Sequence, residues 1–294
     1  MKTRTIISIL ISLFAFSACQ RSKFDSEYET LKHDGEKRSY LLHVPEGYSS
    51  DSAVALIIAL HGGTGSAKNI EEQSGLADFS DEKGFILCSP NGLNRTWNAG
   101  NCCGKASENE VDDVGFISAL IDEVSANYSI NSKQIFFTGM SNGAMMSYRL
   151  ACELSDKIAA IAPVAGTMVA TECNPSQAVS VVHFHSYEDE NVPYDGGIGN
   201  GISDHYNPPL DSVFNAWNGF NNCALSTYFS YNDNVDFWSW LNCTDSTELQ
   251  LYITKDGGHS WPMGIAPRKN ADQPSVAINA NEVMWHFFMS HPKP

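Results

Sequence analysis

A serine flanked by glycines lies near the middle of the chain, in the sequence Gly139-Met140-Ser141-Asn142-Gly143. An apolar segment of strand length, residues 134–138, precedes it, and a segment with helical spacing of apolar residues follows it. Where a strand turns sharply into a helix, side chains two positions before and after the turn residue collide, and glycine at both positions removes the collision. The motif alone is weak, since at average glycine usage about one chain in ten of this length matches by chance. Between a strand and a helix, it predicts an α/β fold in which Ser141 is held outward in strained backbone geometry.

The rest of the chain alternates between strand-like and helix-like segments. Strands are predicted at residues 39–44, 53–60, 85–88, 134–138, 158–164, 179–185 and 249–254, and helices at 113–127, from the serine turn to 154, at 210–220 and at 277–289. This alternation predicts a mostly parallel sheet covered by helices on both faces, in a single domain. Residues 20–38 lack the pattern and are interpreted as a linker, so the folded domain is expected at 39–294.

The first residues have the pattern of an export signal. Lys2 and Arg4 precede an apolar run, residues 6–16, that is too short to span a bilayer comfortably. Small residues and then Cys19 follow, as in a bacterial lipoprotein signal at residues 1–19, in which Cys19 would carry the lipid. An ordinary secretory signal cut nearby is the alternative. We therefore expect an exported chain, lipid-anchored in the periplasm or at the cell surface, or else secreted.

Charge and cysteine content restrict the environment and the partners. The formal net charge is −16 with no basic cluster, which argues against nucleic acid or anionic lipid as partner. Membrane contact is expected only through Cys19, and we expect a monomer. Without Cys19 an odd number of cysteines remains, which predicts three disulfides and one free thiol. Cys88, inside an apolar strand, is the expected free thiol, and Cys223 and Cys243, which flank two strand-like segments, are an expected pair. The pairing of the other four stays open: Cys102, Cys103, Cys152 and Cys173.

No metal is expected. The sequence has no Cys-x-x-Cys pair with a second pair of ligands, which a structural zinc site would need. His183 and His185 alternate along one predicted strand, and we expect them on opposite faces of the sheet, where they could not share an ion.

A serine hydroxyl needs a histidine base to attack an ester. His259 is the expected base, because it lies in a glycine-containing loop directly after a predicted strand, and sites in open α/β sheets form at the carboxyl ends of strands. The acid is expected in the loop after the strand that ends at His185. Asp189 is preferred there, because the shorter aspartate is the usual partner that fixes the imidazole tautomer. The alternatives are Glu188, Glu190 and Asp195.

Donors for a developing oxyanion must already be in place. One is expected to be the backbone N–H of Asn142, at the start of a helix. The other is expected from Gly63 or Thr64 in the sequence His61-Gly62-Gly63-Thr64-Gly65, which lacks the Gly-Lys-Ser/Thr ending of a phosphate-binding loop. Trp97 and Trp261 border predicted site loops. They are expected either to form an aromatic wall for the substrate or to anchor their loops in the core.

Taken together, these segments resemble an esterase family that includes bacterial feruloyl esterases, acetyl xylan esterases and polyhydroxybutyrate-depolymerase-like proteins. The resemblance runs from about residue 38 to 289. It is carried by the serine turn and by residues 60–63, 97–104, 111–116, 162–168, 192–194 and 258–262. It implies an α/β-hydrolase fold and a triad at Ser141, Asp189 and His259, the residues reached above, and the chemistry of such a triad needs no cofactor. Members typically have His-Gly-Thr-x-Asp around the acid, where this chain has His185-Ser186-Tyr187-Glu188-Asp189.

We therefore expect an exported serine carboxylic-ester hydrolase, a feruloyl or acetyl xylan esterase acting on esters of plant cell-wall polysaccharides. A polyhydroxybutyrate depolymerase acting on polyester oligomers is the alternative, although no appended polymer-binding domain is found. A serine peptidase on the same fold is disfavoured by the esterase-like loops. Outside enzymes, the alternative is a surface lipoprotein that binds carbohydrate on a hydrolase scaffold.

Overall fold

The computed structural model describes residues 28–202 and 204–294. The export signal predicted at residues 1–19, with Cys19, lies outside this range. Within it, none of the helices combines the length and the apolar character needed to cross a bilayer.

Ten strands form one mixed sheet. They are β1 (Glu29–His33), β2 (Glu36–His43), β3 (Val54–Leu60), β4 (Ile86–Pro90), β5 (Ile130–Met140), β6 (Ala160–Val164), β7 (Ser180–Ser186), β8 (Leu225–Asn232), β9 (Val235–Leu241) and β10 (Leu249–Thr254). Their order in the sheet is β1-β2-β4-β3-β5-β6-β7-β10-β9-β8. The strands from β4 to β10 in this order run parallel, and an antiparallel pair lies at each edge. β4, β6 and β7 are buried along their whole length, as expected for parallel strands covered on both faces.

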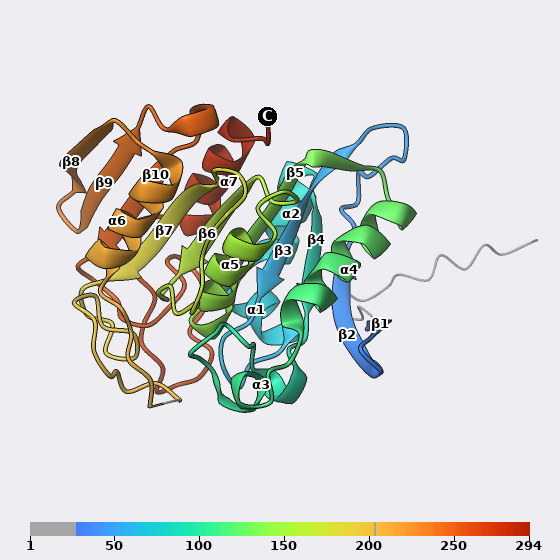
Figure 1. Cartoon of the computed structure of the whole chain (residues 1–294), viewed down its shortest axis with the longest axis horizontal. Coiled ribbons are helices and arrows are strands. Elements are labelled where there is room, and N and C mark those ends of the chain that lie inside the picture. The colour runs from blue at the N-terminus through green and yellow to red at the C-terminus, as the bar shows by residue number, and fades with distance from the viewer. Residues whose placement is uncertain (1–27, 203) are drawn as a thin grey trace, which may run out of the picture.

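Helices cover both faces of this sheet (Figure 1). They are α1 (Ala67–Ser74), α2 (Leu76–Lys83), α3 (Gly104–Glu108), α4 (Asp113–Asn127), α5 (Asn142–Glu153), α6 (Leu210–Asn221) and α7 (Ala280–Ser290), with short 3₁₀ turns at Leu93–Arg95 and Thr244–Ser246. The core has two halves, because alternate residues of each strand point to opposite faces. Leu56 and Ile58 of β3 pack in the half covered by α4, α5 and α6, whereas Ile57 packs in the half covered by α1, α2 and α7. The predicted α/β-hydrolase architecture in a single domain is confirmed.

The sheet begins earlier than the sequence pattern indicated. β1 and part of β2 lie in the segment interpreted as a linker, residues 20–38, so that interpretation is wrong from Glu29 onward. The two strands pair around Asp34-Gly35, both with positive φ (48° and 80°), the conformation of a tight hairpin turn. β1 and the first residues of β2 were missed because β1 lies at the edge of the sheet and both segments are rich in charged residues, which weakens the apolar alternation. The Asp-Gly dipeptide was the available signal.

A buried ion pair ties β2 to α4. Arg38 contacts Asp113 at 2.6 Å, and both side chains are almost completely excluded from solvent. The second carboxylate oxygen of Asp113 accepts the backbone N–H of Asn98 at 2.8 Å. The N-cap of α4 is Asp112, whose side chain accepts from the Gly115 N–H at 2.8 Å. Asp112 thus caps the start of α4, and Asp113, through Asn98, holds a loop beside the candidate active site.

The disulfides agree with the predicted count. Cys223 is bonded to Cys243 as expected, which joins the end of α6 to the end of β9. Cys88 is free and buried, also as expected. The four cysteines left open pair as Cys102–Cys103 and Cys152–Cys173.

Candidate active site

The predicted site loops meet at the carboxyl ends of the parallel strands. Ser141 follows β5, Asp189 lies in the loop after β7, and His259 lies in the loop after β10. Because β5, β6, β7 and β10 are consecutive in the sheet, these loops lie along one edge, the lower edge in Figure 1. A cavity of about 820 Å³ opens there, and Gly63, Ser141, Asn142 and His259 are among the residues that line it.

The serine turn has the strained geometry expected of it. Ser141 has φ 57° and ψ −119°, and α5 begins at the next residue. Its backbone N–H donates to the Val164 carbonyl at 2.9 Å, which fixes the turn against β6. A Cβ on Gly139 would lie 2.6 Å from the carbonyl carbon and oxygen of Gly143, and a Cβ on Gly143 would overlap the Leu60 carbonyl. Both glycines are therefore required by close backbone contact, as predicted.

Replacing Gly143 with alanine should lower the free energy of unfolding by about 3 kcal/mol, at the upper end of the usual overpacking penalty, because its clash is with backbone that cannot rotate away. Urea unfolding measures the change. Gly219→Ala is the matched control, since a Cβ there meets nothing within 4 Å and alanine favours the helix. Equal stability of Gly143→Ala and the parent protein would contradict the close-contact explanation.

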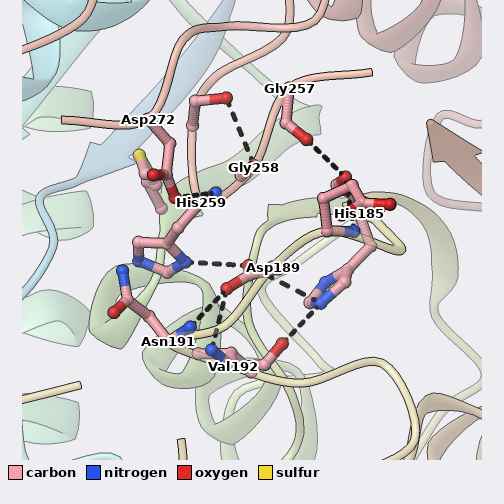
Figure 2. A network of polar contacts seen from close by, with 12 residues as sticks. His185, Asp189, Asn191, Val192, Gly257, Gly258, His259 and Asp272 are labelled. Carbon is pink, nitrogen blue, oxygen red and sulfur yellow. Dashed lines mark hydrogen bonds and ion pairs between the residues drawn. The ribbon is translucent and has the colours of Figure 1, made fainter. Parts of the chain in front are cut away.

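Asp189 and His259 are joined by a short hydrogen bond, 2.8 Å from Asp189 Oδ2 to His259 Nδ1 (Figure 2). The other oxygen, Oδ1, accepts the backbone N–H groups of Asn191 at 2.9 Å and Val192 at 2.8 Å. Burial alone would raise the pKa of the Asp189 carboxyl, but the charge interaction and hydrogen bond with His259, together with the other contacts, outweigh it and lower that pKa. The carboxylate can only accept, so Nδ1 carries the proton and Nε2 of the neutral ring is left as a base.

The loop that presents His259 is held independently. The backbone N–H of His259 donates to Asp272 Oδ2 at 2.7 Å (Figure 2).

Of the alternatives to Asp189, Glu188 and Glu190 line the cavity, and Glu190 accepts a hydrogen bond from the Asn200 side chain at 3.2 Å. Among the described acidic residues, Asp189 is the one that bonds to the His259 ring.

The candidate oxyanion donors divide into two groups. The N–H of Thr64, which has φ 62°, donates to the Arg95 carbonyl at 2.8 Å and is already used. The expectation that Thr64 supplies a donor is therefore wrong. Gly63 and Asn142 both line the cavity and remain the candidates. The side chain of Asn142 is bound to both backbone groups of Trp97, accepting from N–H at 2.7 Å and donating to the carbonyl at 3.0 Å.

The two tryptophans anchor loops in the core. Trp97 and Trp261 are 0% and 1% exposed, and neither lines the cavity. The indole N–H of Trp97 donates to the His61 carbonyl at 3.0 Å, and that of Trp261 donates to the Asn281 side chain at 2.9 Å. The aromatic-wall interpretation is therefore wrong, because burying each indole with its N–H satisfied leaves no face for a substrate.

His61 holds the glycine-rich loop, a role that sequence reasoning missed. Its Nε2 accepts the backbone N–H of Gly92 at 3.0 Å, so Nδ1 carries the proton and donates to the Gly62 carbonyl at 2.7 Å. Burial lowers the pKa of the His61 imidazole to about 4. The available signal was position, since His61 directly follows a wholly apolar strand and precedes consecutive glycines.

Lowering the pH from about 6.5 to about 4 should destabilise the protein by about 3 kcal/mol through His61 alone. In that window the unfolded chain binds a proton that the folded imidazole does not, so the free energy of unfolding falls as pH falls. Urea unfolding at neutral and acid pH measures this loss. His61→Gln removes the titrating ring, so its loss across the same window should be smaller. An identical pH dependence in the two proteins would rule out His61 as the cause.

His183 and His185 lie on the same face of β7, which corrects the expectation that they face apart. Residues two apart in a strand share a face, and Nε2 of His183 is 3.2 Å from Nδ1 of His185.

Among the described residues, one group of three potential metal ligands lies close together, Cys102, Cys103 and His205. Both of its cysteines are oxidised to a disulfide.

The fold and this arrangement define a serine hydrolase of the α/β-hydrolase class. The chain belongs to the phospholipase/carboxylesterase family, whose model matches residues 49–199, and it is a carboxylic-ester hydrolase. A feruloyl esterase C from Emericella nidulans is 25% identical over 259 residues, covering 86% of this chain and 84% of the relative. A feruloyl esterase B from Piromyces equi is 27% identical over 238 residues, covering 76% of this chain but 42% of the relative. In fold, the chain is similar to the acetyl xylan esterase from Aspergillus awamori, with a TM-score of 0.62, 16% identity, and coverage of 90% of this chain and 99% of that one.

Proposed function

We propose that the protein hydrolyses esters through an acyl-enzyme formed on Ser141. His259 Nε2 takes the serine proton as the hydroxyl oxygen attacks the ester carbonyl, and Asp189 stabilises the imidazolium that forms. His259 then gives the proton to the leaving alcohol, and a water molecule repeats the sequence to release the acid. The observation that carries the proposal is the 2.8 Å bond between Asp189 and His259, with Ser141 and His259 lining one cavity.

The tetrahedral oxyanion is stabilised by the N–H groups of Gly63 and Asn142. Asn142 begins α5, so its N–H also carries the positive end of the helix dipole. The Asn142 side chain is held by hydrogen bonds to the backbone of Trp97, and the loop that contains Gly63 is held by the bond from His61 to the Gly62 carbonyl. These donors therefore need no reorganisation during the reaction.

The substrates that we propose are feruloyl or acetyl esters of plant cell-wall polysaccharide. The names of the feruloyl esterase relatives support this class. The cavity is large enough for an aromatic acyl group, and amide side chains such as Asn69, Gln73 and Gln273 line it, which suits a sugar alcohol. Polyhydroxybutyrate oligomers are the alternative substrate. We further propose that the chain is exported and lipid-anchored through Cys19, and acts as a monomer.

Two measurements test the proposal. A phosphorylating reagent such as a dialkyl aryl phosphate should modify one serine, and mass spectrometry should find the adduct on the peptide that contains Ser141. Turnover of methyl ferulate, acetylated xylan and 3-hydroxybutyrate oligomers should then rank the ester classes, with the first or second hydrolysed fastest. Binding of xylan oligosaccharides without turnover of any ester or labelling of Ser141 would favour the alternative of a binding lipoprotein.

A further inference from the structure

Three polar side chains form an unbroken line of hydrogen bonds inside the core behind the site. The Tyr148 hydroxyl is 2.9 Å from His183 Nδ1, His183 Nε2 is 3.2 Å from His185 Nδ1, and His185 Nε2 is 2.8 Å from the Val192 carbonyl oxygen. All three side chains are buried. We call these three residues, Tyr148, His183 and His185, the buried imidazole chain.

The direction of every bond follows from its last member. A carbonyl oxygen can only accept, so His185 Nε2 carries a proton. Burial lowers the pKa of both imidazoles, and each is therefore neutral with one proton. Nδ1 of His185 must then accept from Nε2 of His183, and Nδ1 of His183 must accept from the Tyr148 hydroxyl. All three donors point along the chain toward Val192.

Val192 connects this chain to the acid of the site. Its carbonyl accepts from His185, while its N–H donates to Asp189 Oδ1 at 2.8 Å. The segment just after Asp189 is thus fastened back to β7, the strand that precedes Asp189. Figure 2 shows Asp189 between the rings of His259 and His185, and His185 Nε2 lies 3.7 Å from the Asp189 oxygen that bonds to His259.

Burying three polar side chains is unfavourable unless each is hydrogen-bonded. Apolar side chains of similar size would fill the same space without the free-energy cost of a buried polar group that lacks a partner. Within the buried imidazole chain every ring nitrogen has a hydrogen-bond partner. Its last N–H, on His185, donates to the Val192 carbonyl in the loop that carries Asp189. We propose that the buried imidazole chain is a positioning device that holds Asp189 in the orientation in which it bonds to His259. His185 is the positioning residue, and His183 and Tyr148 satisfy its second nitrogen and complete the line of hydrogen bonds. This inference rests on the proposed function.

His185→Phe keeps a planar ring but removes the donor to Val192. Because displacement of a catalytic group by about 1 Å can cost about 100-fold in rate, we expect kcat for p-nitrophenyl acetate to fall about 10- to 100-fold, with KM changed less than about 2-fold. His185→Gln restores an N–H near the position of Nε2, and we expect it to recover most of the lost kcat. Proton NMR supplies a second readout, since the Nδ1–H of His259 bonded to Asp189 should give a low-field resonance that His185→Phe weakens and His185→Gln keeps.

Tyr148→Phe removes one oxygen atom from the far end and serves if His185→Phe does not fold. It leaves His183 Nδ1 without its donor, so nitrogen-15 NMR of labelled histidines should show a shifted Nδ1 resonance for His183. We expect kcat to fall by about 2- to 5-fold, less than for His185→Phe, because Tyr148 acts through two further bonds. Tyr40→Phe is the matched control. It also removes a buried tyrosine hydroxyl, here bonded to Glu29 at 2.9 Å, but on β2, which is far from β7 in the sheet order, and kcat should not change.

The results separate this inference from the proposed function. Absence of esterase activity in the parent protein would overturn the function, whereas the histidine tautomers can be read by NMR in an inactive protein. The positioning role is overturned if folded His185→Phe keeps kcat within about 2-fold of the parent. It is also overturned if Tyr148→Phe and Tyr40→Phe lower kcat equally, or if the parent spectra show the proton of His183 or His185 on Nδ1 instead of Nε2.

Discussion

Ser141→Ala should lower kcat for ester hydrolysis by about 10⁴- to 10⁶-fold. The substitution removes the hydroxyl that we propose forms the acyl-enzyme and leaves the turn intact, because Ser141 makes its fixing contact to Val164 through the backbone. Alanine can adopt the same backbone geometry at the same strain. We therefore expect an unchanged thermal unfolding midpoint. Steady-state turnover and the pre-steady-state burst with p-nitrophenyl acetate measure the effect, and the burst should vanish.

Ser212→Ala is the matched control for this substitution. Its hydroxyl donates to the Pro209 carbonyl at 2.7 Å on the exposed side of α6, away from the cavity. Activity of the control should equal that of the parent. Retention of more than about one hundredth of the parent kcat by folded Ser141→Ala would remove Ser141 from the mechanism.

The sequence located the loops of the site because each depends on a local pattern. Ser141 stands in a turn whose glycines are demanded by backbone contacts only a few ångströms away. Asp189 and His259 were found by the rule that functional loops follow the carboxyl ends of parallel strands, and the structure joins them at 2.8 Å. A pattern of this kind needs only strand length and order along the chain.

What the sequence did not supply depends on contacts between distant segments. Whether Thr64 has a free N–H is decided by Arg95, and whether Trp97 faces a substrate is decided by His61, which lies 36 residues away. The alignment of His183 with His185 follows directly from strand geometry, and the initial expectation applied that geometry wrongly. Their continuation to Tyr148 could not be foreseen, because it requires the register between α5 and β7.

Asp189→Asn should lower kcat by about 10⁴-fold, more than its small change in shape would indicate. Oδ1 of Asp189 accepts two backbone N–H groups, so the side-chain carbonyl of asparagine must occupy that position. Its NH₂ group then faces His259 Nδ1, where Asp189 Oδ2 had accepted a hydrogen bond. Nδ1 must become the acceptor, and the single proton of the neutral ring moves to Nε2. A protonated Nε2 cannot accept the proton of Ser141.

The loss caused by Asp189→Asn should fall on kcat and not on KM. KM should change little, because the cavity keeps its shape, and nitrogen-15 NMR of labelled histidine should show the proton of His259 on Nε2 instead of Nδ1. Asp195→Asn changes an exposed residue of the same loop that does not line the cavity, and it should leave both kcat and the tautomer unchanged. If Asp189→Asn were as active as Asp195→Asn, the short bond to His259 would have no part in catalysis. If activity fell while the proton stayed on Nδ1, the loss would come from charge alone, since the tautomer would then be set by something other than the hydrogen-bonding pattern around Asp189.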